Sequence, residues 1–401
     1  MSLLANRLSK IKPSATLAVS TKAKELKDKG VDIISLAAGE PDFDTPLNIK
    51  QAAIKGIKEG NTKYTPVTGT TELRQAVCNK FQKENGLSYN TNEVIVSTGG
   101  KQVIYNLFMA TLNEGDEVII PAPYWVSYPD MVLLSGANPI IVKSDIKDNF
   151  KPKLSDIENA ITPKTKWLIL NSPSNPSGAI YDKEYLLKIL ELAKKYPHLH
   201  IMTDDIYEHI IFDEAKFFTI ASLASEEIRK RIFIVNGVSK AYSMTGWRIG
   251  YGAGDESIIK AMSIIQSQST SNPSSISQVA ALEALSGDQK SVLSSISEFQ
   301  EKRDLVISLL SQIKELDCYK PSGAFYLFPK CSQLFGKKTP KNMIINSSAE
   351  LATYLLEKAN VAVVPGVAFG MDEHFRISYA TSKDLLKEAC LRIKNAISEL
   401  S

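Results

Sequence analysis

The sequence is poor in the residues on which several common kinds of site depend. Its 401 residues include only four cysteines and four histidines, and the cysteines stand far apart. That spacing matches no metal-binding pattern, so we predict no metal site and a reducing location in the cytoplasm. The scarcity of histidine also argues against a histidine-bound metal and against a serine–histidine–aspartate triad.

Long apolar runs and an excess of one charge are missing as well. No stretch approaches about 18 consecutive apolar residues, which excludes a typical transmembrane helix. The first residues lack the apolar core of a signal peptide. Because 47 basic residues nearly balance 44 acidic ones, the sequence favours neither a nucleic-acid partner nor a membrane surface. Only eight basic residues are arginine, so each arginine is a candidate for a role that needs its planar fork.

What the middle of the chain does contain is an alternation of short Ile- and Val-rich runs with helical stretches. Continuous apolar runs bounded by Gly, Pro, Asn or Asp are typical of strands buried on both faces of a parallel sheet. We therefore predict an α/β fold with a mainly parallel, seven-stranded sheet flanked by helices. The predicted strands are residues 93–97, 117–121, 139–143, 167–171, 200–204, 232–236 and 249–253.

Open α/β sheets bind ligands beyond the carboxyl ends of their strands, so the residues after each strand are site candidates. Gly99 and Gly100 open a helix after the first strand, which favours a bound phosphate, although a tight turn explains them equally well. Trp125 could stack on a flat ligand or belong to the core. Asn175 could bind a ligand oxygen or merely stabilise its turn.

Charged residues follow the later strands. Asp204 ends the fifth strand, where a buried carboxylate needs a cationic partner unless it caps a helix. Lys240 follows the sixth strand and is a Schiff-base candidate whose pKa Arg248 would lower, although most lysines are solvated surface residues. Arg376 lies in an apolar run and needs a carboxylate, from a ligand or from an internal Asp or Glu.

One small molecule accounts for these residues together. It has a phosphate, a flat ring with an oxygen substituent, a cationic ring nitrogen and an aldehyde, which are the groups of pyridoxal 5′-phosphate. Proteins bind that cofactor with a Schiff-base lysine and an aspartate beside the ring nitrogen. The residues interpreted as its contacts are Gly99, Gly100, Arg248, Trp125, Asn175, Tyr207, Asp204 and Lys240.

Ten motifs carry a resemblance that extends nearly from end to end. The sequence resembles the class I aminotransferases, which are fold-type I pyridoxal-phosphate enzymes, and among them the bacterial aspartate aminotransferases that often also accept prephenate. The segment SKAYSMTGWRIGY is highly specific for the family. In the family's order, the motifs are KPSATLAVS, LAAGEPDFDTP, KYTPVTG, STGGKQ, PYWVSYP, NSPSNPSG, DDIYE, NGVSKAYSMTGWRIGY, PSGAFY and FRISYA.

The resemblance implies a role for each candidate. Lys240 would form the Schiff base and move the substrate's proton, and Asp204 would keep the ring nitrogen protonated. Asn175 and Tyr207 would hydrogen-bond the ring oxygen, and Trp125 would stack on the ring. The residues implied around the phosphate are Gly99, Gly100, Lys101 and Arg248.

The resemblance also implies shared active sites in a homodimer, because Tyr64 would reach the phosphate in a neighbouring subunit. Arg376 would bind the α-carboxylate of the substrate, and the Gly39 backbone would close over it. The segment SIIQSQSTSNPSSISQ lacks the arginine that binds the second carboxylate in the best-known branch, and Gly237 stands where many relatives have a serine. The residues implied on the substrate side are Gly39, Trp125, Asn175, Arg376, Lys12, Ser14, Thr16 and Lys101.

The reaction implied is transfer of the amino group of L-aspartate to 2-oxoglutarate by a ping-pong mechanism, with prephenate as a possible further substrate. Another transaminase or lyase on the same fold, a ligand-sensing regulator and a scaffold without activity remain alternatives. The implied division of the chain is an N-terminal arm with part of the small domain over residues 1–46, a large cofactor-binding domain over 47–282 and a small domain over 283–401. Within it, a long helical segment is predicted over 275–315.

Overall fold

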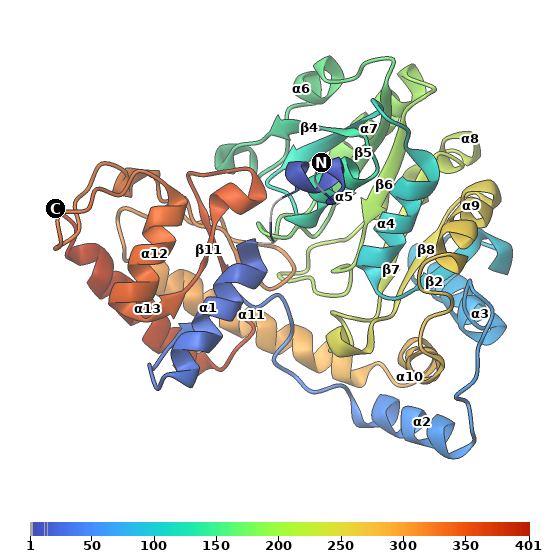
Figure 1. The fold of residues 1–401 in the computed structure, drawn as a ribbon, viewed down its shortest axis with the longest axis horizontal. Helices are drawn as coiled ribbons and strands as arrows, with labels where there is room; N and C mark the ends of the chain where they lie inside the picture. Colours follow the sequence, from blue (N-terminus) through green and yellow to red (C-terminus); the bar gives the residue numbers. More distant parts are fainter. Residues whose placement is uncertain (1–2, 12, 14) are drawn as a thin grey trace.

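The computed structural model describes residues 3–11, 13 and 15–401. Figure 1 shows a large part built on a sheet with helices around it, and beside it a smaller part that contains both the first and the last α-helix of the chain. None of the helices formed by the described residues combines the length and the apolar character that a membrane span requires.

The large sheet has seven strands in the order β2-β8-β7-β6-β5-β3-β4. β8 runs opposite to the other six strands, and all pairs that do not include β8 are parallel. The strands are β2 (Val94–Ser97), β3 (Glu117–Ala122), β4 (Asn138–Lys143), β5 (Thr165–Asn171), β6 (His200–Asp204), β7 (Ile232–Gly237) and β8 (Gly250–Ala253). The predicted fold is thus confirmed, and each predicted strand lies within two residues of its observed bounds.

Helices cover both faces of this sheet. They are α2 (Leu47–Lys58), α3 (Thr71–Lys80), α4 (Gly100–Thr111), α5 (Ser127–Leu134), α6 (Leu154–Asn159), α7 (Lys183–Lys195), α8 (Glu226–Arg229), α9 (Glu256–Ser267) and α10 (Ser275–Ser286). On β5, Leu168 and Leu170 enter a core with α3, α7 and α10, whereas Trp167 and Ile169 enter a second core with α4, α5 and α9. Consecutive apolar residues are needed because successive side chains point to opposite, equally buried faces.

The smaller part combines short strands with longer helices. Its elements are β9 (Tyr326–Leu327), β10 (Val361–Ala362), β11 (Val364–Pro365), β12 (Phe375–Ser378), α1 (Ala15–Asp28), α12 (Ser348–Ala359) and α13 (Lys383–Ser398). The N-terminal segment joins this part because β1 (Ile34–Ser35) pairs in parallel with β10. The division of the chain at residues 46 and 282 stays a prediction.

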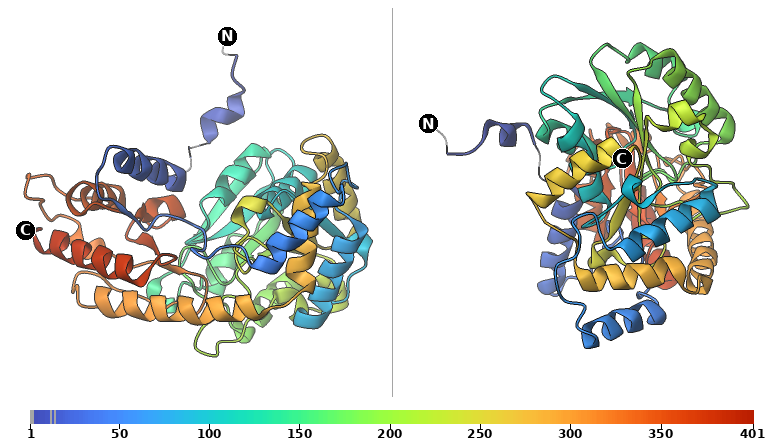
Figure 2. Two further views of the ribbon diagram at one scale, coloured as in Figure 1. Left: turned by 90° about the horizontal axis from the view of Figure 1, so that it is seen from below. Right: turned by 90° about the vertical axis from the view of Figure 1, so that its right-hand side faces the viewer.

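The single helical segment predicted over residues 275–315 is wrong. The chain forms α10 and then α11 (Lys290–Leu310), and the break falls at Gly287. A Cβ on Gly287 would lie 2.7 Å from the carbonyl oxygen of Glu283, and the Asp288 side chain accepts a hydrogen bond from the Lys290 N–H at the start of the next helix. Figures 1 and 2 show that α11 runs alongside both parts of the molecule.

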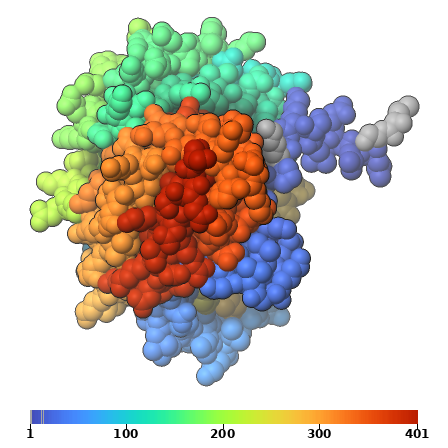
Figure 3. Space-filling model, turned by 90° about the vertical axis from the view of Figure 1, so that its left-hand side faces the viewer, coloured from blue at the N-terminus to red at the C-terminus, as the bar shows by residue number. Residues whose placement is uncertain are grey.

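Residues 3–11 extend beyond the outline of the rest of the molecule (Figures 2 and 3). This segment includes a short 3₁₀ helix over Asn6–Lys10 that buries none of its residues. Its leucines Leu3, Leu4 and Leu8 are 101%, 68% and 52% exposed. Exposed leucines on a projecting segment are suited to contact another protein surface.

Candidate active site

A cavity of 620 Å³ lies where the parallel strands of the large sheet end. β6 and β7 lead into it from the large part, and Tyr326 on β9 and Arg376 on β12 line it from the smaller part. This is the position at which open α/β sheets bind ligands. The residues predicted for the site that line it are Thr16, Gly39, Gly100, Lys101, Trp125, Asn175, Asp204, Tyr207, Lys240, Arg248 and Arg376.

Lys240 presents a buried amine to the cavity. Its Nζ donates a hydrogen bond to the Gly39 carbonyl and lies 5.9 Å from the ring centres of both Tyr207 and Phe325. Burial, assisted by the positive charge of Arg376, lowers the pKa of Lys240 to about 8. About a tenth of this amine is therefore neutral at pH 7, far more than for an ordinary lysine, and the neutral amine is the form that attacks an aldehyde.

Asp204 supplies a buried carboxylate at the end of β6. One oxygen accepts a hydrogen bond from the Tyr128 hydroxyl at 2.6 Å, and the other accepts a longer one, 3.4 Å, from the Ile206 N–H. Burial raises the pKa of Asp204 to about 6, against the opposing effect of Tyr128. The alternative role as a helix cap is not observed, because residues 206–209 form a turn and no helix. A cationic ligand group would offset the cost of burying this charge.

Arg376 is a buried cation without a carboxylate partner in the described part of the chain. The side chain donates to the Asn175 amide oxygen at 3.0 Å and to the Ala37 carbonyl at 2.7 Å, while its Nε has no partner among the residues that the structure describes. It stacks on the rings of Tyr326 and Phe369 at 4.6 and 5.0 Å. The internal salt bridge that sequence alone allowed is therefore absent from residues 3–11, 13 and 15–401. Such an arginine requires an anionic ligand.

The start of α4 forms a cradle with Arg248. Gly99 has a positive φ of 86°, and a Cβ there would lie 2.3 Å from a guanidinium nitrogen of Arg248. Gly100 begins the helix, so its first N–H groups and the positive end of the helix dipole face the same place. Lys101 follows, with its Nζ 5.0 Å from the Trp125 ring centre, and burial lowers its pKa. This arrangement suits a phosphate.

The residues present therefore fit pyridoxal 5′-phosphate. Gly99 lets the Arg248 guanidinium pack against the start of α4, which gathers positive charge for a phosphate. The amine of Lys240 is activated for an aldehyde, and the buried Asp204 needs a cation. No described residue neutralises Arg376, which leaves that guanidinium for a second, anionic molecule.

Some predicted residues do not reach the cavity. Tyr64 is 93% exposed and lies outside it, and Gly99 contributes through its contact with Arg248 and not through the cavity wall. Lys12 and Ser14 fall outside the described residues. Thr16 does line the cavity, and its buried hydroxyl has no hydrogen-bond partner among the described residues.

Two tyrosines of the site were not predicted from the sequence. Tyr128 holds Asp204, and Tyr326 exchanges a hydrogen bond of 2.8 Å between its hydroxyl and that of Tyr207 while stacking on Arg376. Both stand inside motifs that were identified, PYWVSYP and PSGAFY. The only available signal was the spacing of Tyr128 three residues after Trp125, which brings two side chains to one side of a helical turn.

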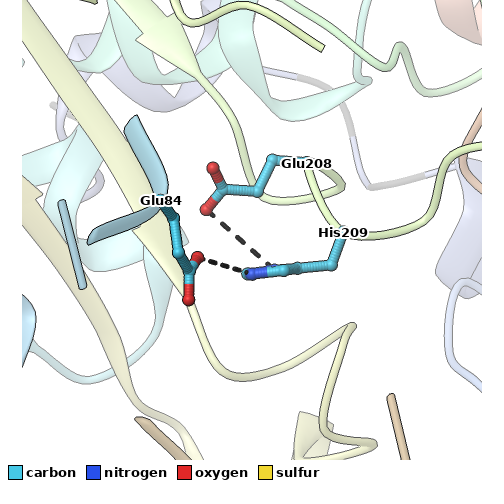
Figure 4. Close-up of side chains that lie close together, drawn as sticks. All are labelled: Glu84, Glu208 and His209. Carbon is cyan, nitrogen blue, oxygen red and sulfur yellow. Dashed lines mark hydrogen bonds and ion pairs between the residues drawn. The ribbon is translucent and has the colours of Figure 1, made fainter. Parts of the chain in front are cut away.

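Glu84, Glu208 and His209 form a polar cluster, and the last two directly follow Tyr207 in the chain (Figure 4). One ligand atom from each lies within 4.8 Å of the others. The ammonium of Lys80 pairs with the carboxylate of Glu208 and lies 3.4 Å from that of Glu84. Burial would raise the pKa of Glu208, but Lys80 overcomes this effect and holds the pKa at about 2. A lysine thus supplies the positive charge that these carboxylates require.

The buried carboxyl of Asp205, next to Asp204, is expected to lower the stability of the fold as the pH rises. Burial raises the pKa of Asp205 from 3.8 to about 7, whereas the unfolded acid ionises near pH 4. Between these values the folded state binds more protons, so this group costs stability as the pH rises. We expect Asp205→Asn to gain about 2–4 kcal/mol of stability, relative to the parent, between about pH 4 and pH 8. Thermal melts across that range measure the change.

Asp255→Asn is the matched control, because a hydrogen bond from Ser257 lowers the pKa of Asp255. Because a lowered pKa confines the proton uptake of Asp255 to below about pH 4, the Asp255→Asn effect relative to the parent should stay nearly constant between about pH 4 and pH 8. If Asp205→Asn changed the free energy of unfolding by the same amount at about pH 4 and about pH 8, the raised pKa of Asp205 would be contradicted.

Comparison with known proteins agrees with this geometry. The family model for aminotransferase class I and II matches residues 31–393. A probable aspartate/prephenate aminotransferase of Rickettsia felis is 61% identical over 401 residues, which cover 100% of this chain and 98% of that protein. The aspartate/prephenate aminotransferase of Cereibacter sphaeroides is 52% identical, with 100% of both chains covered. The solved aspartate aminotransferase of Rhizobium meliloti is 49% identical and superposes with a TM-score of 0.96 over 100% of both chains.

Proposed function

Because the chain belongs to the class I and II aminotransferase family, we propose that it transfers the amino group of L-aspartate to 2-oxoglutarate, giving oxaloacetate and L-glutamate. We also propose that it accepts prephenate, since similar proteins carry the name aspartate/prephenate aminotransferase. The observation that supports a reaction of amino acids most directly is one cavity that holds both a reactive amine, Lys240, and a buried arginine, Arg376, that no carboxylate of the described residues neutralises.

Pyridoxal 5′-phosphate is the proposed cofactor. When bound, it supplies an electron sink that stabilises negative charge at the α-carbon of an amino acid. The residues proposed to hold it are Gly99, Gly100, Lys101, Arg248, Trp125, Asn175, Tyr207, Asp204 and Lys240.

Each catalytic side chain has a task that its surroundings support. The lowered pKa of Lys240 lets its Nζ take up and return the proton of the substrate α-carbon near neutral pH. Asp204 keeps a proton on the ring nitrogen, because an ionised, buried carboxylate favours a cation beside it. Arg376 orients the α-carboxylate with its planar fork. The Gly39 carbonyl, which accepts from Lys240, closes the site on the substrate side.

The second carboxylate of aspartate needs a separate cation. Lys101 is the candidate within the described residues, since it lines the cavity beside Trp125 and forms no ion pair there. The buried hydroxyl of Thr16, for which the described part of the chain offers no hydrogen-bond partner, is a second candidate, and Lys12 and Ser14 stay predictions. A lysine and hydroxyls recognise a carboxylate less strictly than a bidentate arginine, which is compatible with more than one substrate.

A homodimer with shared active sites is the proposed assembly. The exposed ring of Tyr64 and the exposed leucines of residues 3–11 are suited to a second copy of the chain. The four cysteines are unpaired, which is compatible with the proposed location in the cytoplasm.

Initial-rate kinetics test the proposed reaction. With aspartate and 2-oxoglutarate both varied, we expect parallel double-reciprocal lines, because the first product leaves before the second substrate binds. Intersecting lines would contradict a ping-pong transaminase. Release of ammonia from aspartate without any oxo acid would support a lyase instead.

The pKa of Lys240 predicts how its reactivity changes with pH. Protein freed of cofactor should capture pyridoxal phosphate faster as the pH rises, with a midpoint near 8, because the neutral amine reacts. Borohydride trapping followed by peptide mapping identifies the modified lysine and gives the rate at each pH. A midpoint close to that of ordinary lysines, about 10.4, would contradict the assignment.

A further inference from the structure

Tyr128 contacts two of the residues proposed to hold the cofactor. It lies on α5, is 1% exposed, and donates a hydrogen bond of 2.6 Å from its hydroxyl to the Asp204 carboxylate. Its ring meets the Trp125 ring edge-to-face, with centroids 5.3 Å apart and an angle of 83° between the planes. One side chain therefore touches both the proposed partner of the ring nitrogen and the aromatic ring proposed to stack on the cofactor.

We propose that Tyr128 is a positioning residue: its hydroxyl holds the Asp204 carboxylate toward the ring nitrogen, and its ring fixes Trp125 over the ring face. This inference rests on the proposed function, because it concerns how the chain prepares the pyridoxal phosphate site. In this role Tyr128 acts through its two neighbours, Asp204 and Trp125.

The hydroxyl is the main short hydrogen-bond donor to Asp204. Among the described residues, the other donor to that carboxylate is the Ile206 N–H, at 3.4 Å. Burial, together with the charge of Asp204, raises the pKa of Tyr128 well above its ordinary value, so the hydroxyl stays a donor throughout the working range. Removing it leaves a buried, ionised oxygen with poor hydrogen bonding, which is costly.

The loss of cofactor affinity on removing the Tyr128 hydroxyl should become smaller as the pH rises. The charged and titratable groups around the pair are Lys240 after β7, Tyr207 after β6 and Tyr181 after β5, and none of them replaces the lost donor. Without the hydroxyl, the pKa of Asp204 rises further above about 6. Over the window just above that value, the variant carries a neutral acid where the parent carries a carboxylate. A neutral acid holds a cationic ring nitrogen less tightly, and the difference shrinks once both proteins are ionised.

The test compares cofactor affinity in the parent and in Tyr128→Phe. The dissociation constant of pyridoxal phosphate is measured by titrating cofactor-free protein and following its visible absorption. We expect it to rise about 10-fold in the variant at about pH 6.5 and no more than about threefold at about pH 8.5. In an Asp204→Asn background, adding Tyr128→Phe should leave no pH-dependent difference, because the charge that the hydroxyl holds is gone.

Tyr354→Phe is the matched control, since Tyr354 is also buried and donates its hydroxyl to the Ala396 carbonyl at 2.8 Å, away from the cavity. It should leave the affinity unchanged at both pH values, and thermal melts report the folding of every variant. If the parent binds pyridoxal phosphate but the dissociation constant of Tyr128→Phe equals the parental one, or exceeds it by the same factor at both pH values, the role of Tyr128 alone is overturned. Failure of the parent to bind pyridoxal phosphate would overturn the proposed function and this role with it.

Discussion

Replacing Lys240 by alanine is expected to lower kcat for aspartate by at least about 10⁴-fold. The variant loses the amine that is proposed to join the cofactor aldehyde and to move the α-carbon proton. No other amine in the described part of the chain shares its setting, since Lys101, the other lysine of the cavity, lies over Trp125 beside the phosphate cradle. Steady-state rates with saturating aspartate and 2-oxoglutarate measure the loss.

Two further substitutions separate chemistry from charge. Lys240→Arg keeps a cation in place but cannot act as a base near neutral pH, so it should be about as inactive as the alanine variant. Lys260→Ala changes an exposed lysine on α9 that pairs with Glu256 and lies outside the residues lining the cavity, and it should retain parental activity. A Lys240→Ala enzyme that keeps more than about one hundredth of the parental kcat would contradict the role of this lysine.

Replacing Arg376 by alanine is expected to lower kcat/KM for aspartate by about 10³-fold, equivalent to about 4 kcal/mol. Among the described residues, the buried guanidinium is bound only by neutral oxygens and its Nε has no partner, so the α-carboxylate would be its charged partner. Arg376→Lys keeps the charge but loses the fork, and we expect a smaller loss of about 10²-fold, mostly as a raised KM.

Arg392→Lys is the control for replacing an arginine by lysine away from the cavity, because Arg392 pairs with Asp32 and Glu388 on the surface. It should leave kcat/KM within about twofold of the parent. If Arg376→Ala left the KM for aspartate unchanged, the α-carboxylate would have to bind elsewhere.

The sheet could be predicted from the sequence because its strands are buried on both faces, which produces continuous apolar runs such as WLILN. The break between α10 and α11 could not, because apolar periodicity continues through residues 275–310 and one glycine with the aspartate after it decides where the helices separate.

The site residues that follow strands could be predicted because the ends of parallel strands meet at one edge of the sheet. Residues that act through their neighbours left no such signal. Tyr128 bonds a carboxylate 76 positions away, and Tyr326 bonds Tyr207 119 positions away, and both contacts exist only after the chain has folded. Sequence alone also left open whether Arg376 has an internal partner, a question that its neutral surroundings answer.

The most direct test of a pyridoxal-phosphate transaminase is the absorption spectrum of the purified protein before and after adding aspartate alone. We expect a visible band from the cofactor bound to Lys240, its loss on adding aspartate, and its return on adding 2-oxoglutarate. A visible band that does not change on adding aspartate would exclude aspartate as a substrate. No visible band after adding pyridoxal phosphate would contradict the central claim that Lys240 holds this cofactor.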